Sequence, residues 1–162
     1  MATTKLPAKK RVLFLCLGNA VRSQMAEAIA RHTASDVAIY ASAGLTALGS
    51  IAPLTHRVLA ERGISSDGHH SKQFTEAAGG AADIVVNMSG ESRPRALAGC
   101  RAEIENWEVV DPYGAEIEEY RKACDAIGLR VTEFTARLRA QRAAQLAKQS
   151  PRAGSAPRRS KS

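Results

Sequence analysis

A short apolar run at residues 11–16 (RVLFLC) constrains the fold of this chain more than any other feature. Its successive apolar residues, rich in β-formers, are typical of a strand buried on both faces of a parallel sheet. Similar runs recur at Val37–Ser42, Ala82–Met88 and Trp107–Val110, and helix-like segments separate them. Strands that alternate with helices predict an α/β fold with a small four-stranded parallel sheet and helices on both faces.

The helices are predicted from apolar spacing. Helical patterns cover Ser23–His32 and Pro53–Arg62, and a shorter one covers Ser89–Leu97. The longest helix carries one apolar stripe whose members are three or four residues apart. That stripe consists of Ile117, Tyr120, Cys124, Ile127, Val131, Phe134 and Leu138. We expect its packing against the body of the protein to end at Leu138.

The 162 residues are enough for one domain, and 44% of them are hydrophobic, which indicates a globular protein. The net charge of +7 belongs to the ends: residues 12–133 hold 11 basic and 16 acidic residues, whereas residues 1–11 and 134–162 hold no acid. We therefore divide the chain into a basic N-terminal extension (1–10), an α/β domain (11–140) and a basic, largely disordered tail (141–162). The tail could attract an anionic partner nonspecifically, although a solvated tail is the simpler interpretation because no aromatic residues are interleaved with its charges.

The longest apolar run has six residues, Val12–Leu17, whereas a membrane span needs about 20. We expect no membrane span and no signal peptide. The three cysteines, at positions 16, 100 and 124, are too few and too scattered for a disulfide framework or an all-cysteine zinc site. A reduced, cytoplasmic protein is the resulting expectation.

The turn after the first strand is the candidate site, because ligands of parallel sheets bind at the carboxyl ends of the strands. Cys16 ends the strand, and a helix follows the turn. A turn of this kind can direct several backbone N–H groups inward at a helix N-terminus and so bind an anion. Gly18 permits close backbone approach, and Asn19 tolerates a left-handed conformation. Arg22 supplies a planar fork for a tetrahedral oxyanion.

The positive surroundings would favour the Cys16 thiolate at neutral pH, and Ser23 could donate a hydrogen bond to it. Cys124 and Arg130 repeat the spacing of Cys16 and Arg22. That second pair lies within the long helix, so we interpret Cys124 as a core residue.

Residues 13–28 (LFLCLGNAVRSQMAEA) resemble the signature of low-molecular-weight protein tyrosine phosphatases and of the thioredoxin-coupled arsenate reductases that share their fold. Further stretches agree in order: residues 41–44 (ASAG), His69 with residues 72–73 (KQ), Ile84–Met88, and residues 111–113 (DPY). The resemblance covers about residues 11–140 and implies a flavodoxin-like strand order 2-1-3-4.

By this resemblance, Cys16 attacks phosphorus and becomes a phosphocysteine, while Arg22 holds the equatorial oxygens. Asp111 protonates the leaving group and then activates water. Ser42 and His69 brace Asn19, with His70 as a competitor for that role. Tyr113 forms a wall for the substrate. The phosphate-binding loop comprises Leu17, Gly18, Asn19, Ala20, Val21, Arg22 and Ser23. No metal or cofactor is required, because Arg22 and the backbone dipoles supply positive charge.

The implied substrate is a phosphorylated protein or a small phosphomonoester, and phosphate-like oxyanions should inhibit. Val21 stands where the phosphatases usually carry a second cysteine. Ala20 matches neither the bulky aliphatic residue of the tyrosine phosphatases nor the threonine of the arginine phosphatases, so protein-arginine phosphatase activity stays open. Arsenate reduction with a small thiol or a thioredoxin-type reductant also stays open, but residues 87–99 hold no relay cysteine, which favours the small thiol. A non-enzymatic alternative is a phosphate-binding module, which would need neither Cys16 nor Asp111.

Overall fold

The computed structural model describes residues 7–149. Its four strands form one parallel sheet in the order β2-β1-β3-β4, which confirms the predicted fold and strand order. The strands are β1 (Lys10–Cys16), β2 (Ala38–Gly44), β3 (Ile84–Asn87) and β4 (Glu103–Asn106). Since the strands are parallel, the segments that follow them meet at one edge of the sheet.

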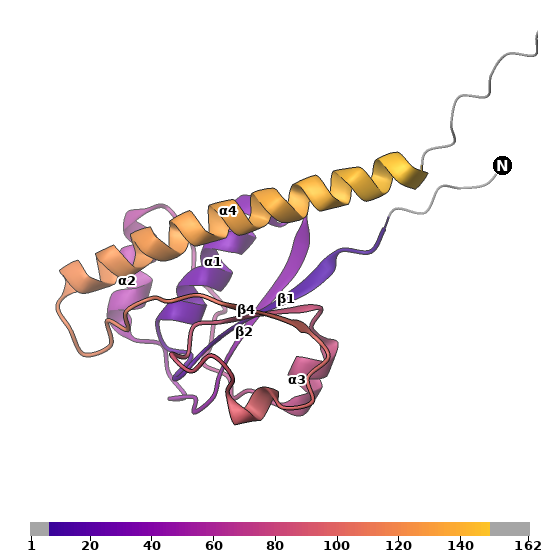
Figure 1. Cartoon of the computed structure of the whole chain (residues 1–162). Coiled ribbons are helices and arrows are strands. Elements are labelled where there is room, and N and C mark those ends of the chain that lie inside the picture. Colours follow the sequence, from indigo (N-terminus) through magenta and orange to yellow (C-terminus); the bar gives the residue numbers. More distant parts are fainter. Residues whose placement is uncertain (1–6, 150–162) are drawn as a thin grey trace, which may run out of the picture.

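The helices cover both faces of the sheet unequally (Figure 1). Three of them, α1 (Arg22–Ala34), α2 (Pro53–Glu61) and α4 (Ile117–Gln149), pack together on one face. The other face carries α3 (Glu76–Ala81) and the 3₁₀ turn η1 (Arg95–Leu97). The sequence did not predict α3, because its six residues (EAAGGA) are too few to show an apolar period.

Strand β1 is buried from both sides, as its composition indicates. Val12, Phe14 and Cys16 face the large core under α1 and α4. Leu13 and Leu15 face the smaller core under α3 and η1. The site at the end of β1 is therefore anchored in the most buried part of the molecule.

Two predicted elements are corrected by the structure. The helix expected over Ser89–Leu97 is only the turn η1, because Gly90 takes a left-handed φ of 93° and Pro94 disfavours helix in the residue before it. The fourth strand lies at Glu103–Asn106 rather than at Trp107–Val110. It is a mostly exposed edge strand of the sequence EIEN, so it lacks an apolar run. The apolar Trp107 follows this strand and serves the core instead. Its ring packs edge-on against Phe134 of α4, at a centroid distance of 5.8 Å.

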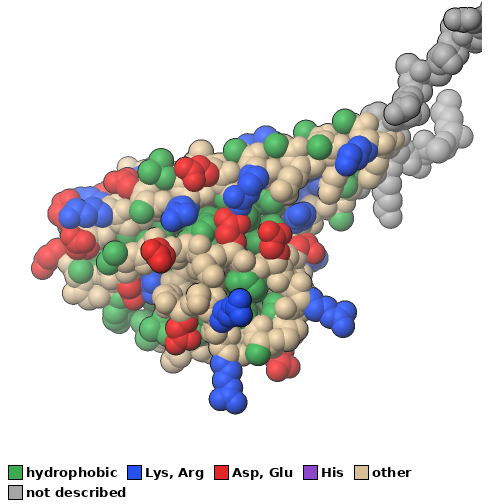
Figure 2. Space-filling model, viewed as in Figure 1, with side chains coloured by type: hydrophobic (Ala, Val, Ile, Leu, Met, Phe, Trp, Pro, Cys, Tyr) green, Lys and Arg blue, Asp and Glu red, His purple; other side chains and the backbone are tan. Residues whose placement is uncertain are grey.

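Helix α4 follows the predicted stripe but is longer than predicted. It continues to Gln149, so residues 141–149, which the sequence assigns to the tail, are helical, whereas the last buried residue of the helix is Leu138. On its C-terminal half the charged side chains are Lys and Arg (Figure 2). The expectations for residues 1–6 and 150–162 lie outside the described residues. Within residues 7–149, none of the helices combines the length and the apolar character that crossing a bilayer requires.

Candidate active site

The anion loop, Cys16–Ser23, joins β1 to α1 and contains the predicted nucleophile. Cys16 is 2% exposed, and its Sγ lies 2.9 Å from the Ser23 Oγ. Ser23 Oγ also accepts a hydrogen bond of 2.7 Å from the Asn19 side-chain amide. The Ser23 hydroxyl hydrogen is therefore free to point at the sulfur, as stabilisation of a thiolate requires.

The carbonyl groups of the anion loop point outward, into the segment that follows β2. Backbone N–H groups of that segment donate to them: Leu45 to Cys16 over 3.0 Å, Thr46 to Leu17 over 2.8 Å, Leu48 to Gly18 over 3.0 Å and Ala52 to Ala20 over 3.1 Å. In a trans peptide the C=O and N–H groups point in opposite directions. The N–H groups of the anion loop are thereby turned toward the inside, an arrangement that suits an anion at the start of α1.

Gly44, at the end of β2, lies directly against this loop. A Cβ atom at this position would come within 2.8 Å of both the Asn19 nitrogen and the Leu17 oxygen, which are backbone atoms. Glycine is thus required by close approach rather than by its φ angle. Gly44 belongs to the ASAG stretch that carries the family resemblance, but no pattern in the sequence indicates its steric role.

Asn19 is the one non-glycine residue with a positive φ among residues 7–149, at 47°. Its Oδ1 accepts 2.8 Å hydrogen bonds from the Lys72 backbone N–H and from Gln24 Nε2. These contacts differ from the prediction, in which Ser42 and His69 brace Asn19. Ser42 Oγ accepts from Lys72 Nζ over 3.4 Å, and His69 Nδ1 contacts Gln24 Oε1 over 3.1 Å, so each reaches the loop through another residue. His70 contributes its backbone carbonyl, which accepts from Gln24 Nε2 over 2.9 Å.

Arg22 and Asp111 are brought together at the mouth of the anion loop, as predicted. Arg22 Nη2 lies 3.3 Å from Asp111 Oδ2. Nη1 of Arg22 donates to the carbonyl oxygens of Met88, over 2.6 Å, and Val109, over 3.3 Å. Nε of Arg22 is buried and has no hydrogen-bond partner. A buried guanidinium N–H without a partner is costly, and an oxyanion in the loop would satisfy it.

One cavity of about 290 Å³ contains the predicted catalytic groups. Cys16, Arg22 and Asp111 line it together with Tyr113, the predicted substrate wall. Its remaining lining is mostly apolar and comes from the anion loop and the segment after β2: Leu17, Gly18, Ala20, Val21, Thr46 and Leu48. The cavity thus combines the polar groups of Cys16, Arg22 and Asp111 with mostly apolar walls, which suit an apolar or aromatic group.

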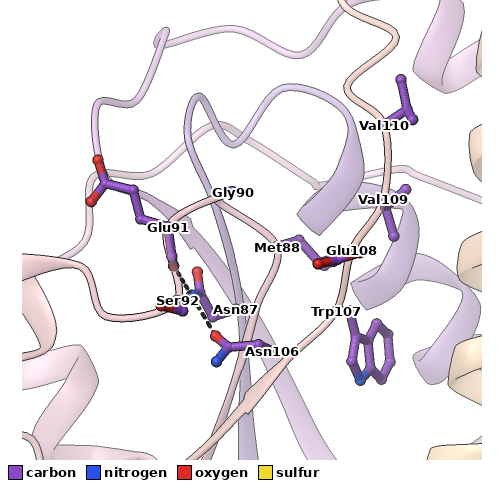
Figure 3. Close-up of a pocket in the computed structure, with 10 residues that line it drawn as sticks. All are labelled: Asn87, Met88, Gly90, Glu91, Ser92, Asn106, Trp107, Glu108, Val109 and Val110. Atoms are coloured by element: carbon purple, nitrogen blue, oxygen red, sulfur yellow. Dashed lines mark hydrogen bonds between the residues drawn. The ribbon is translucent and has the colours of Figure 1, made fainter.

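A second cavity, of about 500 Å³, is lined by residues of two segments (Figure 3). It runs between the turn after β3 and the segment after β4. The Asn87 side chain connects the two segments that line it: it donates to the Glu91 carbonyl oxygen over 2.6 Å and to Asn106 Oδ1 over 2.8 Å. Met88 and Val109, whose carbonyls hold Arg22, line this cavity.

Glu27 is buried behind the anion loop and lies close to three basic side chains, a cluster not predicted from the sequence alone. Its carboxylate is 3.5 Å from His69 Nδ1, 3.9 Å from Lys72 Nζ and 3.3 Å from Arg31 Nη1. Burial lowers the pKa of His69 and of Lys72, and the Glu27 charge opposes both shifts. An acidic residue inside the otherwise small and apolar stretch MAEAIA is the sequence signal that could have indicated this cluster.

The other two cysteines lie away from the cavity. Cys124 is fully buried in α4, and burial raises the pKa of its thiol, in agreement with a core role. Cys100 is half-buried, and its Sγ contacts the Gly79 carbonyl oxygen at 3.5 Å, on the α3 face of the sheet. Neither thiol lines the cavity that holds Cys16.

A parallel α/β sheet with a cysteine-centred anion loop, a buried arginine and a facing aspartate defines a cysteine-dependent phosphatase-like protein. The family model "Low molecular weight phosphotyrosine protein phosphatase" matches residues 11–144. The chain belongs to this family.

Its relatives have more than one named activity. The chain is 31% identical over 142 residues to a probable low molecular weight protein-tyrosine-phosphatase, EpsP, of Ralstonia nicotianae, and the match covers 81% of this chain and 97% of the relative. It is 34% identical to an arsenate reductase of Shouchella clausii, with 78% and 96% covered. Among solved structures, the YwlE arginine phosphatase from Geobacillus stearothermophilus superposes with a TM-score of 0.77 at 25% identity, with 84% and 97% covered.

Proposed function

We propose that the chain is a phosphatase that hydrolyses phosphomonoesters through a phosphocysteine intermediate. One observation carries the proposal: the Cys16 thiol, the Arg22 guanidinium and the Asp111 carboxylate line the same cavity, with Asp111 3.3 Å from Arg22. A module that only binds phosphate needs the arginine and the backbone N–H groups but neither a nucleophile nor an acid.

The proposed reaction has two displacements at phosphorus. In the first, the Cys16 thiolate forms an S–P bond, the P–O bond to the leaving group breaks, and protonated Asp111 gives its proton to the leaving oxygen. In the second, water forms a new P–O bond, its proton passes to the Asp111 carboxylate, and the S–P bond breaks to release phosphate and the thiolate. Arg22 and the inward N–H groups stabilise the equatorial oxygens in both steps.

The substrate we propose is an aryl phosphate of the phosphotyrosine type. The cavity walls include Leu17, Leu48 and Tyr113, which expose 48%, 51% and 58% of their surface beside the polar groups of the cavity. Apolar walls of this kind favour a flat aromatic leaving group over a hydrophilic guanidinium. The arginine phosphatase among the structural relatives keeps phosphoarginine as an alternative substrate, which a direct comparison must test.

Arsenate reduction is the second candidate, supported by the 34% identity to an arsenate reductase. In that reaction Cys16 attacks arsenic and water leaves. A small thiol then attacks the Cys16 sulfur, so that a mixed disulfide forms and arsenite leaves with the electron pair. A second thiol regenerates Cys16 by exchange. An external thiol is needed because Cys100 and Cys124 do not line the cavity.

The test is a comparison of substrates on the purified protein: a phosphotyrosine peptide, a phosphoarginine peptide, and arsenate with a small thiol. Cys16→Ser should abolish turnover of the true substrate, while Cys100→Ser, which alters a thiol outside the cavity, should retain it. Inorganic phosphate should inhibit competitively. If the parent protein and Cys16→Ser have the same negligible rates on all three, the chain is a binding module and the proposal is wrong.

The proposed setting is a reducing one. All three cysteines are free thiols, and the nucleophile would be lost if it were oxidised. We therefore propose the cytoplasm. The basic C-terminal end of α4 and the residues beyond it are proposed as a nonspecific contact for anionic partners, which salt should weaken.

A further inference from the structure

Gln24, in the first turn of α1, is joined to the anion loop by its side chain. It is 1% exposed. Its Nε2 lies 2.8 Å from Asn19 Oδ1, 3.2 Å from the Asn19 carbonyl oxygen and 2.9 Å from the His70 carbonyl oxygen. Its Oε1 lies 3.1 Å from His69 Nδ1. Every polar atom of this buried amide therefore has a partner.

The surroundings fix which way the Gln24 amide points. Its nitrogen faces three oxygens that can only accept hydrogen bonds, and its oxygen faces a ring nitrogen that can donate. A rotated amide would place its oxygen against those three acceptors and lose all three hydrogen bonds, keeping at most a donation to His69 Nδ1. Gln24 is thus held in one orientation, as a donor to the loop and an acceptor from His69.

The contact from Gln24 continues to the nucleophile. Asn19, to which Gln24 donates, has the left-handed φ of 47° and donates from its own amide to Ser23 Oγ over 2.7 Å. Ser23 Oγ lies 2.9 Å from Cys16 Sγ. Gln24 thus donates to Asn19 and Asn19 donates to Ser23. With the Ser23 hydroxyl donating to the Cys16 sulfur, all three hydrogen bonds run in the same direction.

Gln24 does not line the cavity that holds Cys16, Arg22 and Asp111. It therefore has no direct contact with a substrate there. We propose that Gln24 is a positioning residue, whose side-chain amide holds Asn19 in its left-handed conformation and so keeps Ser23 aimed at the Cys16 sulfur. The effect on turnover rests on the phosphatase proposed above, whereas the effect on the sulfur does not.

The test compares Gln24→Met, which keeps the length of the side chain and removes its hydrogen bonds, with Gln24→Glu. The glutamate can still accept from His69, but it places a carboxylate against three acceptor oxygens. Alkylation of Cys16 by iodoacetamide is followed across pH by mass spectrometry of the Cys16 peptide. Arg22 and Asp111 are the charged groups that share its cavity, and both stay in place in these variants.

We expect both variants to raise the pH of half-maximal alkylation by about one unit and to lower kcat on an aryl phosphate about tenfold, the effect of one lost hydrogen bond, with KM nearly constant. Thr135→Val is the control. It removes a buried 2.8 Å hydrogen bond to the Val131 carbonyl in α4, and it should lower the melting temperature without moving the alkylation midpoint.

A wild-type midpoint and kcat in folded Gln24→Met would overturn the proposal. Because this variant could also lose stability, circular dichroism and thermal unfolding are recorded beside Thr135→Val. A wild-type midpoint in Gln24→Glu would likewise show that the donor is not needed. If the parent protein turns over no phosphate ester, the proposed function fails, but the alkylation midpoints still decide the role of Gln24.

Discussion

The Arg22 guanidinium and the Asp111 carboxylate form an ion pair, with Nη2 3.3 Å from Oδ2. Arg22 is fixed, because it is buried and donates to the Met88 and Val109 carbonyl oxygens. Asp111 is more exposed, with 42% of its side chain accessible. The buried Arg22 therefore positions the more exposed Asp111 at the cavity mouth, and an oxyanion bound to Arg22 would compete for the same N–H groups.

Asp111→Asn should lower kcat by about 10² to 10⁴ for substrates with poor leaving groups, because no proton is then delivered to the departing oxygen. The loss should be smaller for p-nitrophenyl phosphate, whose leaving group departs without protonation. Steady-state rates on both substrates measure the difference. Glu108→Gln, which changes a carboxylate outside this cavity, is the matched control. Equal losses on both substrates would argue against the acid role.

Gly44→Ala should damage the anion loop, because the added Cβ would lie 2.8 Å from backbone atoms of Leu17 and Asn19. Relieving such overlap costs about 1–3 kcal/mol, and it moves the N–H groups that we propose bind the oxyanion. Phosphate inhibition constants and chemical denaturation measure the two effects. Gly80→Ala is the control, since nothing lies within 4 Å of its Cβ position. Phosphate binding as tight as in the parent would contradict the close approach.

His69 should make stability depend on pH. Burial lowers its pKa in the folded protein below the ordinary 6.5, although the nearby Glu27 carboxylate opposes this shift. The unfolded chain then binds the proton more readily, so the stability contributed by neutral His69 is present above pH 6.5 and is lost as the pH falls below it. Urea denaturation between pH 8 and 5 should show a shallower decline for His69→Gln than for the parent. Parallel curves would contradict the lowered pKa.

Tyr113→Ala should raise KM for aryl phosphates several-fold and change kcat less, because it removes the proposed aromatic wall of the cavity and no group of the proposed chemistry. Leu129→Ala is the control: this side chain is also well exposed, at 69%, but lies on α4. Steady-state kinetics on an aryl and an alkyl phosphate measure the effect. An unchanged KM for the aryl ester would remove Tyr113 from the substrate wall.

The parallel sheet and the anion loop were predictable because they depend on local patterns. The buried run before Cys16, the turn at Gly18 and Asn19, and the stripe along α4 each leave a period or a spacing in the sequence. Strand β4 was misplaced because an edge strand has no such pattern, and its apolar neighbour Trp107 serves a different contact.

The supports of the loop were less predictable, because they join residues far apart in the chain. Lys72 reaches Asn19 through its backbone N–H, a donor that no side-chain identity reveals. Gly44 must be glycine because backbone atoms of the anion loop lie against it. Gln24 lies between His69 and Asn19, for which a direct contact was predicted. Only three-dimensional placement distinguishes these roles.

The outward carbonyls of the anion loop carry an evolutionary consequence. In the proposed function a tetrahedral anion is bound there mainly by main-chain N–H groups, which amino-acid replacement at most loop positions leaves in place. The side chains that line the cavity can therefore change during evolution, and with them the reaction, while the main chain of the anion loop stays the same. A main chain that binds the anion and side chains that select the substrate would produce a family with tyrosine phosphatases, arginine phosphatases and arsenate reductases on one fold.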